Sequence, residues 1–128
     1  MRSQAREAVF KYIYSRLFNT GDEGLFDVLC KDLKKESKIF AQNLLASIDS
    51  NLDKYLEKIS ELSHGYQLNR VFEVDKCVLI LGMAELDNFR ETDVPIVIDQ
   101  AVNISAKYST ESSTGYVNGI LAEYAKEL

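Results

Sequence analysis

The sequence predicts an all-α fold, because apolar residues recur at helical spacing along nearly the whole chain and helix breakers are few. Only one proline and six glycines occur in 128 residues, which favours long helices over many short strands. No segment shows a convincing apolar–polar alternation of the kind that marks a half-buried strand. We therefore expect a bundle of helices.

Three helices are predicted in the first half of the chain. Apolar spacing indicates helices over residues 4–18 and 25–33, separated by the turn-forming residues 19–24. A longer helix is predicted over residues 37–62. Its expected inward positions are Ala41, Leu45, Ile48, Leu52, Tyr55, Ile59 and Leu62. Their alternating spacing of four and three residues is typical of a seam that packs against neighbouring helices.

The second half is predicted to surround one buried helix. Residues 74–89 are apolar nearly all round in their middle, which is typical of a central helix. Gly82 within that helix indicates a close crossing with another helix.

Flanking signals place the remaining elements. A short helical turn is expected over residues 68–72, and Pro95 fits the first turn of a helix over 95–108. Ser112 or Ser113 is expected to cap the last helix.

The break around residues 63–67 divides the chain into two parts. We expect a single domain, residues 1–128, built from two three-helix sub-bundles, about 1–62 and 68–128, that share one core.

Composition excludes several classes of protein. The net charge of −5 argues against a protein that coats nucleic acid by charge alone. The longest apolar run, residues 77–84, is far too short to span a membrane. Cys30 and Cys77 are isolated and are expected to be buried thiols rather than metal ligands or disulfide partners. We expect a cytoplasmic protein without metal or cofactor.

No residue pattern indicates catalysis. His64 is the sole histidine and falls in a predicted loop, where a solvated role is more common than a catalytic one. The carboxylates lie on predicted solvent faces at helical spacing, and no phosphate-binding glycine loop or hydrolase motif occurs. We therefore expect no catalytic residue and no enzyme.

The distribution of charge is more informative than its sum. Residues 1–64 carry ten basic and ten acidic side chains, whereas residues 65–128 carry five and ten. The first sixteen residues carry four basic side chains and one acidic side chain, a local charge of 4 − 1 = +3. Arg2 and Arg6 share a helix face, which suggests a cationic tip projecting from the bundle. A simple solvated terminus explains the same pattern.

Two tyrosines extend this candidate surface. Tyr108 ends one predicted helix and Tyr116 begins the next. Exposed rings beside arginines are typical of single-stranded RNA binding, although burial in the core explains the same spacing.

Four segments resemble the NusB family of bacterial transcription antitermination factors. They are the helix from Asp75 to Leu86, the DVP loop at 93–95, the IDQAVNISAKY helix and the YVNGIL segment at 116–121. Upstream, the AREAVFKYIY segment at 5–14 is similar to the family's first helix. Their order and spacing make the resemblance specific.

The resemblance implies the helical NusB fold and an RNA-binding function. Members bind the boxA segment of nascent RNA together with NusE, a small-subunit ribosomal protein. The pair helps RNA polymerase to read through terminators, notably in ribosomal RNA operons. No membrane association is implied.

The resemblance also implies the site residues. The RNA-binding positions match Arg2, Arg6, Tyr108 and Tyr116, and the NusE-binding positions match Tyr14 and Asp75. The family's arginine run is interrupted here by Ser3 and Gln4, and Gly115 replaces a frequent basic residue before Tyr116. Fewer phosphate partners predict weaker RNA binding and a shallower dependence on salt. We expect Asn118 to cap the helix backbone rather than contact RNA.

Two alternative functions fit the same residues. In the first, the domain is a protein-only interaction module whose acidic second half binds basic NusE with negligible RNA contact. In the second, it recognises RNA for an rRNA cytosine methyltransferase on a separate chain.

Overall fold

The computed structural model of the protein describes residues 2–17, 23–63 and 71–128. Within these residues there are six α-helices and no strand, which confirms the all-α prediction. The helices are α1 (Arg2–Ser15), α2 (Glu23–Leu29), α3 (Lys35–Leu62), α4 (Glu73–Asn88), α5 (Val94–Tyr108) and α6 (Glu111–Lys126). None of these helices is long and apolar enough to cross a membrane.

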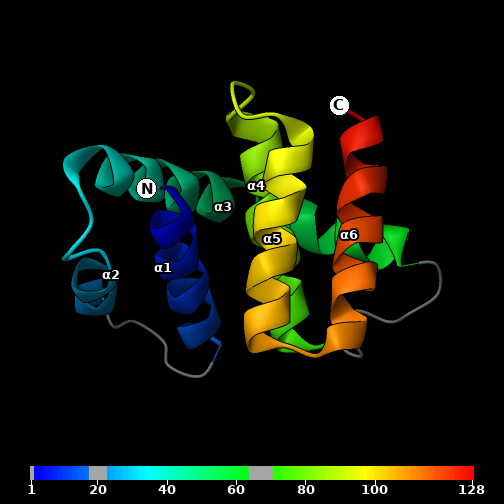
Figure 1. Ribbon diagram of the computed structural model, residues 1–128, viewed down its shortest axis with the longest axis horizontal. Helices are drawn as coiled ribbons and strands as arrows, with labels where there is room; N and C mark the ends of the chain where they lie inside the picture. The colour runs from blue at the N-terminus through cyan, green and yellow to red at the C-terminus, as the bar shows by residue number, and fades with distance from the viewer. Residues whose placement is uncertain (1, 18–22, 64–70) are drawn as a thin grey trace.

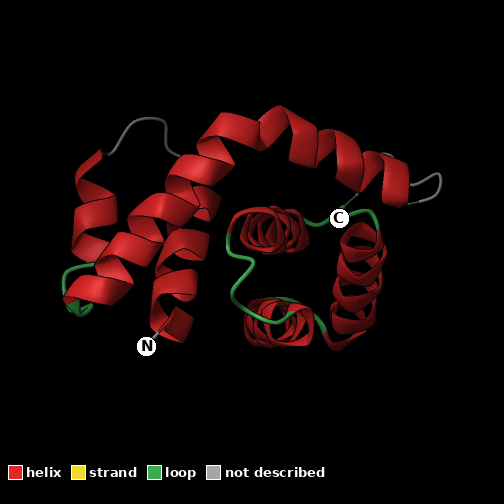
Figure 2. Cartoon of the chain, turned by 90° about the horizontal axis from the view of Figure 1, so that it is seen from above, coloured by secondary structure: helices red, strands yellow, loops and turns green. Residues whose placement is uncertain are grey.

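The helices form two groups that α3 connects. Figure 1 shows α1 beside α2 at one end of the molecule, and α4, α5 and α6 at the other. Seen from above, α3 passes along both groups (Figure 2). It bends at Asn51, where φ is −129° and ψ is 19°, and the Asn51 side-chain amide donates a hydrogen bond to the Ser47 carbonyl at 3.0 Å. The bend lets one helix follow a curved surface.

Helix α4 lies at the centre of the molecule, as its sequence predicts. It packs against α1, α3, α5 and α6, so it has almost no solvent-facing side. Its buried residues are Asp75, Cys77, Val78, Leu79, Ile80, Leu81, Gly82, Met83, Ala84, Glu85 and Leu86. Burial of this helix on all sides makes it the main source of apolar contact in the fold.

The two cysteines are buried free thiols, as expected. Burial raises the pKa of Cys77 to about 12, and burial also raises the pKa of Cys30. Because the thiolate is the reactive form, both side chains are poor nucleophiles at neutral pH.

A polar network inside the bundle joins α3, α4 and α6. The Asp87 carboxylate accepts hydrogen bonds from the Tyr55 hydroxyl at 2.9 Å and from the Tyr124 hydroxyl at 2.8 Å. The Lys54 ammonium donates to the same carboxylate at 3.0 Å. Burial, followed by the contact with Asp87, raises the pKa of both tyrosines above the ordinary value. The network satisfies two hydroxyls at the edge of the core.

Two local predictions, both on α6, are wrong. Thr110, rather than Ser112 or Ser113, is the N-cap residue of α6. The helix begins at Glu111, so both serines lie inside its first turn. In α3 all seven predicted inward positions are in the core or pack against it, but Leu44 is fully buried whereas Leu45, like Leu52 and Leu62, is partly buried. Both leucines fit a helical seam, and the position of the neighbouring helices decides between them.

Asn118 lies in the interior of α6 and is exposed, so it does not cap a helix.

Other predictions fall outside the described residues. They are the solvated loop at His64, the break near Gly65, most of the turn at 19–24 and the start of the turn at 68–72.

Gly82 permits close packing between α4 and α6, as predicted. A Cβ atom at this position would lie 2.7 Å and 3.0 Å from the two Cδ atoms of Leu121. Leu121 is fully buried, so it has little room to move away. Gly119, in the same pair of helices, has no other atom within 4 Å of such a Cβ.

We expect Gly82→Ala to lower the free energy of unfolding by about 1 kcal/mol. The clash with Leu121 costs about 1–3 kcal/mol, which exceeds the gain of about 1 kcal/mol in helix propensity. Gly119→Ala is the matched control and should raise the free energy of unfolding by about 0.5–1 kcal/mol. Urea denaturation measures both, and equal stabilisation by the two changes would contradict the packing role of Gly82.

Candidate functional site

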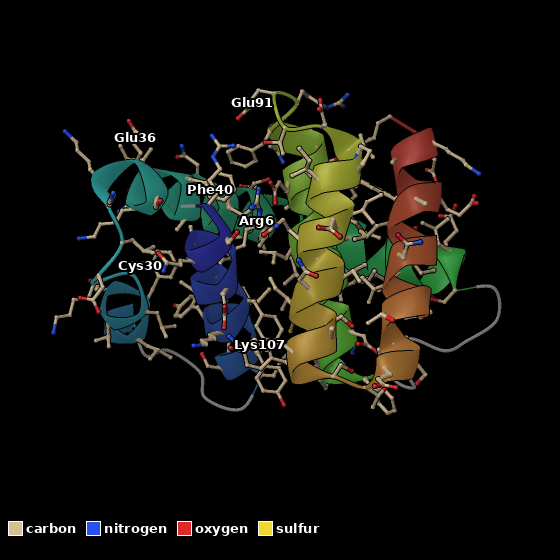
Figure 3. All side chains as sticks on the ribbon, viewed as in Figure 1. Arg6, Cys30, Glu36, Phe40, Glu91 and Lys107 are labelled. Carbon is tan, nitrogen blue, oxygen red and sulfur yellow. The ribbon has the colours of Figure 1, made fainter. Side chains whose placement is uncertain are left out.

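Arg6 lies inside the domain, and the prediction that it projects from the bundle is wrong. Its guanidinium donates to both carboxylate oxygens of Glu85, at 2.7 Å and 2.6 Å. The two side chains are only 6% and 2% exposed. A buried charge requires a charged partner with good geometry, and this pair joins α1 to the last turn of α4. Figure 3 shows Arg6 next to Phe40, whose ring centroid lies 5.5 Å from the guanidinium.

The sequence contained a signal for this pairing. Glu85 is the one acidic residue between Lys76 and Leu86 in an otherwise apolar segment. A carboxylate in that position is buried together with the rest of the helix, and it then needs a cation on a neighbouring helix. The first helix supplies that cation.

Arg2 is on the surface at the start of α1. Its guanidinium contacts Glu91 at 3.3 Å and the Thr92 hydroxyl at 3.2 Å, both in the loop between α4 and α5. It also lies 4.5 Å from the centroid of the Phe40 ring. The Arg2 side chain is 43% exposed, so it remains accessible to a phosphate.

Tyr108 and Lys107 form a cluster with Glu7 on the seam between α1 and the end of α5. The Lys107 ammonium donates to Glu7 Oε1 at 2.7 Å, and the Tyr108 hydroxyl donates to the same oxygen. Lys11 lies 4.0 Å from this carboxylate, and the ring of Tyr108 packs on Phe10 with a centroid separation of 5.1 Å. We call Glu7, Lys11, Lys107 and Tyr108 the Glu7 cluster; it places two cations beside a partly exposed aromatic ring.

The cluster has a defined protonation state. The hydrogen bond from Lys107, then that from Tyr108, lowers the pKa of Glu7 below its ordinary value of 4.5. The same contact with Glu7 raises the pKa of Lys107. Glu7 is therefore a carboxylate and Lys107 an ammonium at neutral pH.

Tyr116 lies on a different groove from Tyr108. Its hydroxyl is 2.6 Å from Ser63 Oγ at the end of α3, and Ser63 in turn donates to the Ile59 carbonyl. Because the Ser63 proton is used in this way, the Tyr116 hydroxyl is the donor of the pair. The ring is partly exposed and lines a shallow groove with Leu62, Ser63, Gly115, Gly119, Ile120 and Glu123.

Tyr14 lies in a groove at the end of α1 that Tyr108 also lines. The groove brings together the start of α4 and the end of α5, and its lining residues are Tyr14, Phe72, Glu73, Val74, Tyr108, Ser109 and Thr110. Phe72 is 62% exposed. It is not identified from the sequence, and its only signal there is an aromatic residue directly before a helix. We call this surface the Tyr14 groove.

Asp75 does not reach the surface. It lies in the first turn of α4 and is only 3% exposed. Among the described residues its Oδ1 atom has no hydrogen-bond partner, which is costly for a buried polar atom. Asp75 therefore lies beneath the surface formed by its neighbours, and its Oδ1 atom accepts no hydrogen bond from the described residues.

Comparison with known proteins identifies close relatives along the whole chain. A family profile described as the NusB family matches residues 3–126. The chain is 30% identical over 133 residues to a transcription antitermination protein NusB from Natranaerobius thermophilus, covering 99% of this chain and 96% of the relative. It is 36% identical over 129 residues to the NusB protein of Pseudothermotoga lettingae, covering 98% and 91%.

Solved structures show the same architecture. The T. maritima NusB structure matches with a TM-score of 0.92 at 32% identity, covering 99% of this chain and 92% of that one. A chain in the complex of antitermination factors NusB and NusE with double-stranded RNA matches with a TM-score of 0.84 at 24% identity, covering 99% and 97%. The similarity to the chain of the NusB and NusE complex shows a shared fold.

We expect loss of the buried ion pair to be strongly destabilising. Arg6→Leu leaves the Glu85 carboxylate buried without a partner, which should lower the free energy of unfolding by about 3–5 kcal/mol. Replacing both residues, as Arg6→Met with Glu85→Leu, should restore most of the loss. Arg2→Ala is the exposed control and should cost less than about 1 kcal/mol. Chemical denaturation checks all three, and an Arg6→Leu effect as small as that of Arg2→Ala would refute the buried role.

We expect Lys107→Gln to raise the pKa of Glu7 toward 4.5, because the hydrogen bond from Lys107 is the largest cause of its lowering. A pKa that is lowered in the folded state stabilises the protein above the unfolded value, and this contribution disappears as pH falls through the folded pKa. An NMR titration of the Glu7 carboxyl carbon measures the shift. Lys126→Gln, far along the chain, is the control, and an unchanged Glu7 pKa in Lys107→Gln would show that the contact is absent in solution.

Proposed function

This chain belongs to the NusB family, and as the starting point for its function we propose that it binds boxA-type single-stranded RNA together with NusE. The family consists of transcription antitermination factors rather than enzymes. In this proposal residues 1–128 act as one RNA-binding domain of two sub-bundles in the bacterial cytoplasm. The bound RNA and NusE join the RNA polymerase antitermination complex and promote read-through, notably in ribosomal RNA operons.

The observation that carries the RNA proposal is the Glu7 cluster. It holds the Tyr108 ring by its hydroxyl, so that an aromatic surface is fixed beside two lysine side chains. A base that stacks on an aromatic ring gains on the order of 1–3 kcal/mol, and nearby cations attract its phosphates. Arg2 extends the cationic surface along α1, and Tyr116 supplies a second ring on the other side of the turn between α5 and α6.

Arg6 has a different role in this proposal. Because its guanidinium is paired with Glu85, it does not contact phosphate. It fixes α1 against α4, and α1 carries both Arg2 and Glu7. Arg6 therefore supports RNA binding by positioning.

The Tyr14 groove is the proposed docking surface for NusE. It combines an exposed aromatic ring, Phe72, with Tyr14 and with the acidic first turn of α4, which contains Glu73 and Asp75. The second half of the chain carries all of the net charge of −5, and acidic surfaces attract basic ribosomal proteins. Asp75 is buried beneath this surface, so in this proposal it contributes negative charge to the first turn of α4 rather than a direct contact with the partner.

A protein-only module that binds NusE with negligible RNA contact is the second candidate. It is favoured by the observation that Lys107 and Tyr108 are already hydrogen-bonded to Glu7, and that Arg6 is withdrawn from the surface. The two candidates differ only in whether RNA binds, so one assay separates them.

The assay is RNA binding across a salt series, with and without NusE, using a boxA-like RNA and a scrambled RNA. We expect preferential binding of the boxA-like RNA that NusE strengthens and that salt weakens. Equal binding of the two RNAs under every condition would sink the RNA proposal and leave the protein-only module.

Two variants should separate the two surfaces. Tyr116→Ala removes a stacking ring and should weaken RNA binding by about 1–3 kcal/mol while leaving NusE binding unchanged. Phe72→Ala removes the exposed ring of the Tyr14 groove and should weaken NusE binding while leaving direct RNA binding unchanged. Calorimetry with each partner measures both. Unchanged RNA affinity in Tyr116→Ala would remove that residue from the site.

A further inference from the structure

A lysine-rich segment joins α2 to α3. Residues 31–38 contain four lysines, Lys31, Lys34, Lys35 and Lys38, together with Asp32 and Glu36, so the local charge is 4 − 2 = +2 in a chain whose net charge is −5. The first three lysines are exposed, and Lys38 is partly exposed. We call residues 31–38 the lysine corner.

The lysine corner differs from the rest of the basic surface because its charges are unpaired. Among the described residues, every lysine and arginine outside the corner except Arg90 forms an ion pair with a carboxylate. None of the four lysines of the corner has such a partner among these residues, although acidic side chains occur in the same segment.

Folding does not explain the choice of lysine here. Lys34 occupies the N-cap position of α3 and makes no capping hydrogen bond with its side chain, because a lysine ammonium has no acceptor to offer the first backbone N–H groups. Lys35 and Lys38 follow in the first turn, where the positive end of a long helix disfavours further positive charge. Glu36 in the same turn has the favourable sign, but the three lysines add nothing favourable to the helix start, so their charge is available for binding.

The corner is continuous with the proposed RNA surface. Figures 1 and 2 show the first turn of α1 close to the first half of α3, and Figure 3 places Glu36 at the outer start of α3, with Phe40 nearer to Arg6. The Arg2 guanidinium lies 4.5 Å from the Phe40 ring centroid. Lys35 precedes Phe40 by five residues, a rise of about 7.5 Å along the helix. A single strand that passes Arg2 therefore reaches the corner within a short length of chain.

We propose that the lysine corner is a second contact surface for single-stranded RNA, which holds the phosphates of the segment that continues beyond Arg2. The proposal rests on RNA binding at the Glu7 cluster. A polyanion suits the corner because evenly repeated phosphates neutralise several separated lysines and release bound counterions, without reading bases. The corner thus adds affinity and salt dependence for long RNA but no sequence preference.

The test compares a boxA-like RNA with the same RNA extended at both ends by oligouridine. The wild-type chain should bind the extended RNA more tightly and with a steeper salt dependence. Lys35→Gln with Lys38→Gln should lower the affinity for the extended RNA on the order of fivefold and reduce the salt slope by about 0.7 of a log unit per lost contact. Binding of the short RNA should not change.

A matched control removes the same charge elsewhere. Lys58→Gln with Lys126→Gln eliminates two exposed or partly exposed lysines that are paired with Glu127 and Glu123, and it should leave the extended-RNA affinity unchanged. An equal loss in this control would overturn the proposal, because net charge alone would then account for the effect. Polyglutamate that binds wild-type protein as tightly as the oligouridine extension would also overturn it.

A stability measurement distinguishes binding from a structural role. Lys34→Ser supplies a capping oxygen to α3, so it should raise the thermal midpoint while weakening binding of the extended RNA. A lower thermal midpoint would show that Lys34 serves the fold. If the wild-type chain binds neither RNA, with or without NusE, the proposed function fails. If it binds both RNAs equally, the lysine corner alone is refuted.

Discussion

The buried ion pair between Arg6 and Glu85 is the interaction on which the arrangement of the site depends. It fixes the first helix against the central helix with two short hydrogen bonds in a region closed to water. Removal of either partner leaves an uncompensated charge, so the two helices cannot slide or separate without a large cost in free energy. Specific docking of α1 follows from this pair more than from apolar contact, which is less directional.

Arg2, the Glu7 cluster and the Tyr14 groove all use the helix that this pair holds. Arg2 lies at one end of α1, Glu7 on its α5-facing side, and Tyr14 at the other end. The RNA and partner surfaces are therefore neighbours on one rigid element, and Tyr108 contributes both to the Glu7 cluster and to the Tyr14 groove. Under the proposed function, shared use of Tyr108 gives a physical route by which binding at one surface influences binding at the other.

The pairing of charges explains how an acidic protein presents a surface to RNA. Most described cations are committed to carboxylates, so a phosphate must compete with an existing partner at Arg2 and Lys107. The lysine corner lacks that competition. This division favours weak, partner-dependent binding at the Glu7 cluster and sequence-independent attraction of flanking RNA at the corner.

The sequence by itself determined the helical class, the central position of α4, the close approach at Gly82 and the family. These features depend on local spacing and on the burial of apolar runs, which the residue order encodes directly. It did not determine that Arg6 is buried, that Leu44 is more deeply buried than Leu45, or that Tyr108 and Tyr116 line different grooves. Those outcomes depend on which groups from distant parts of the chain meet, and only the tertiary structure decides whether a charge meets a partner or water.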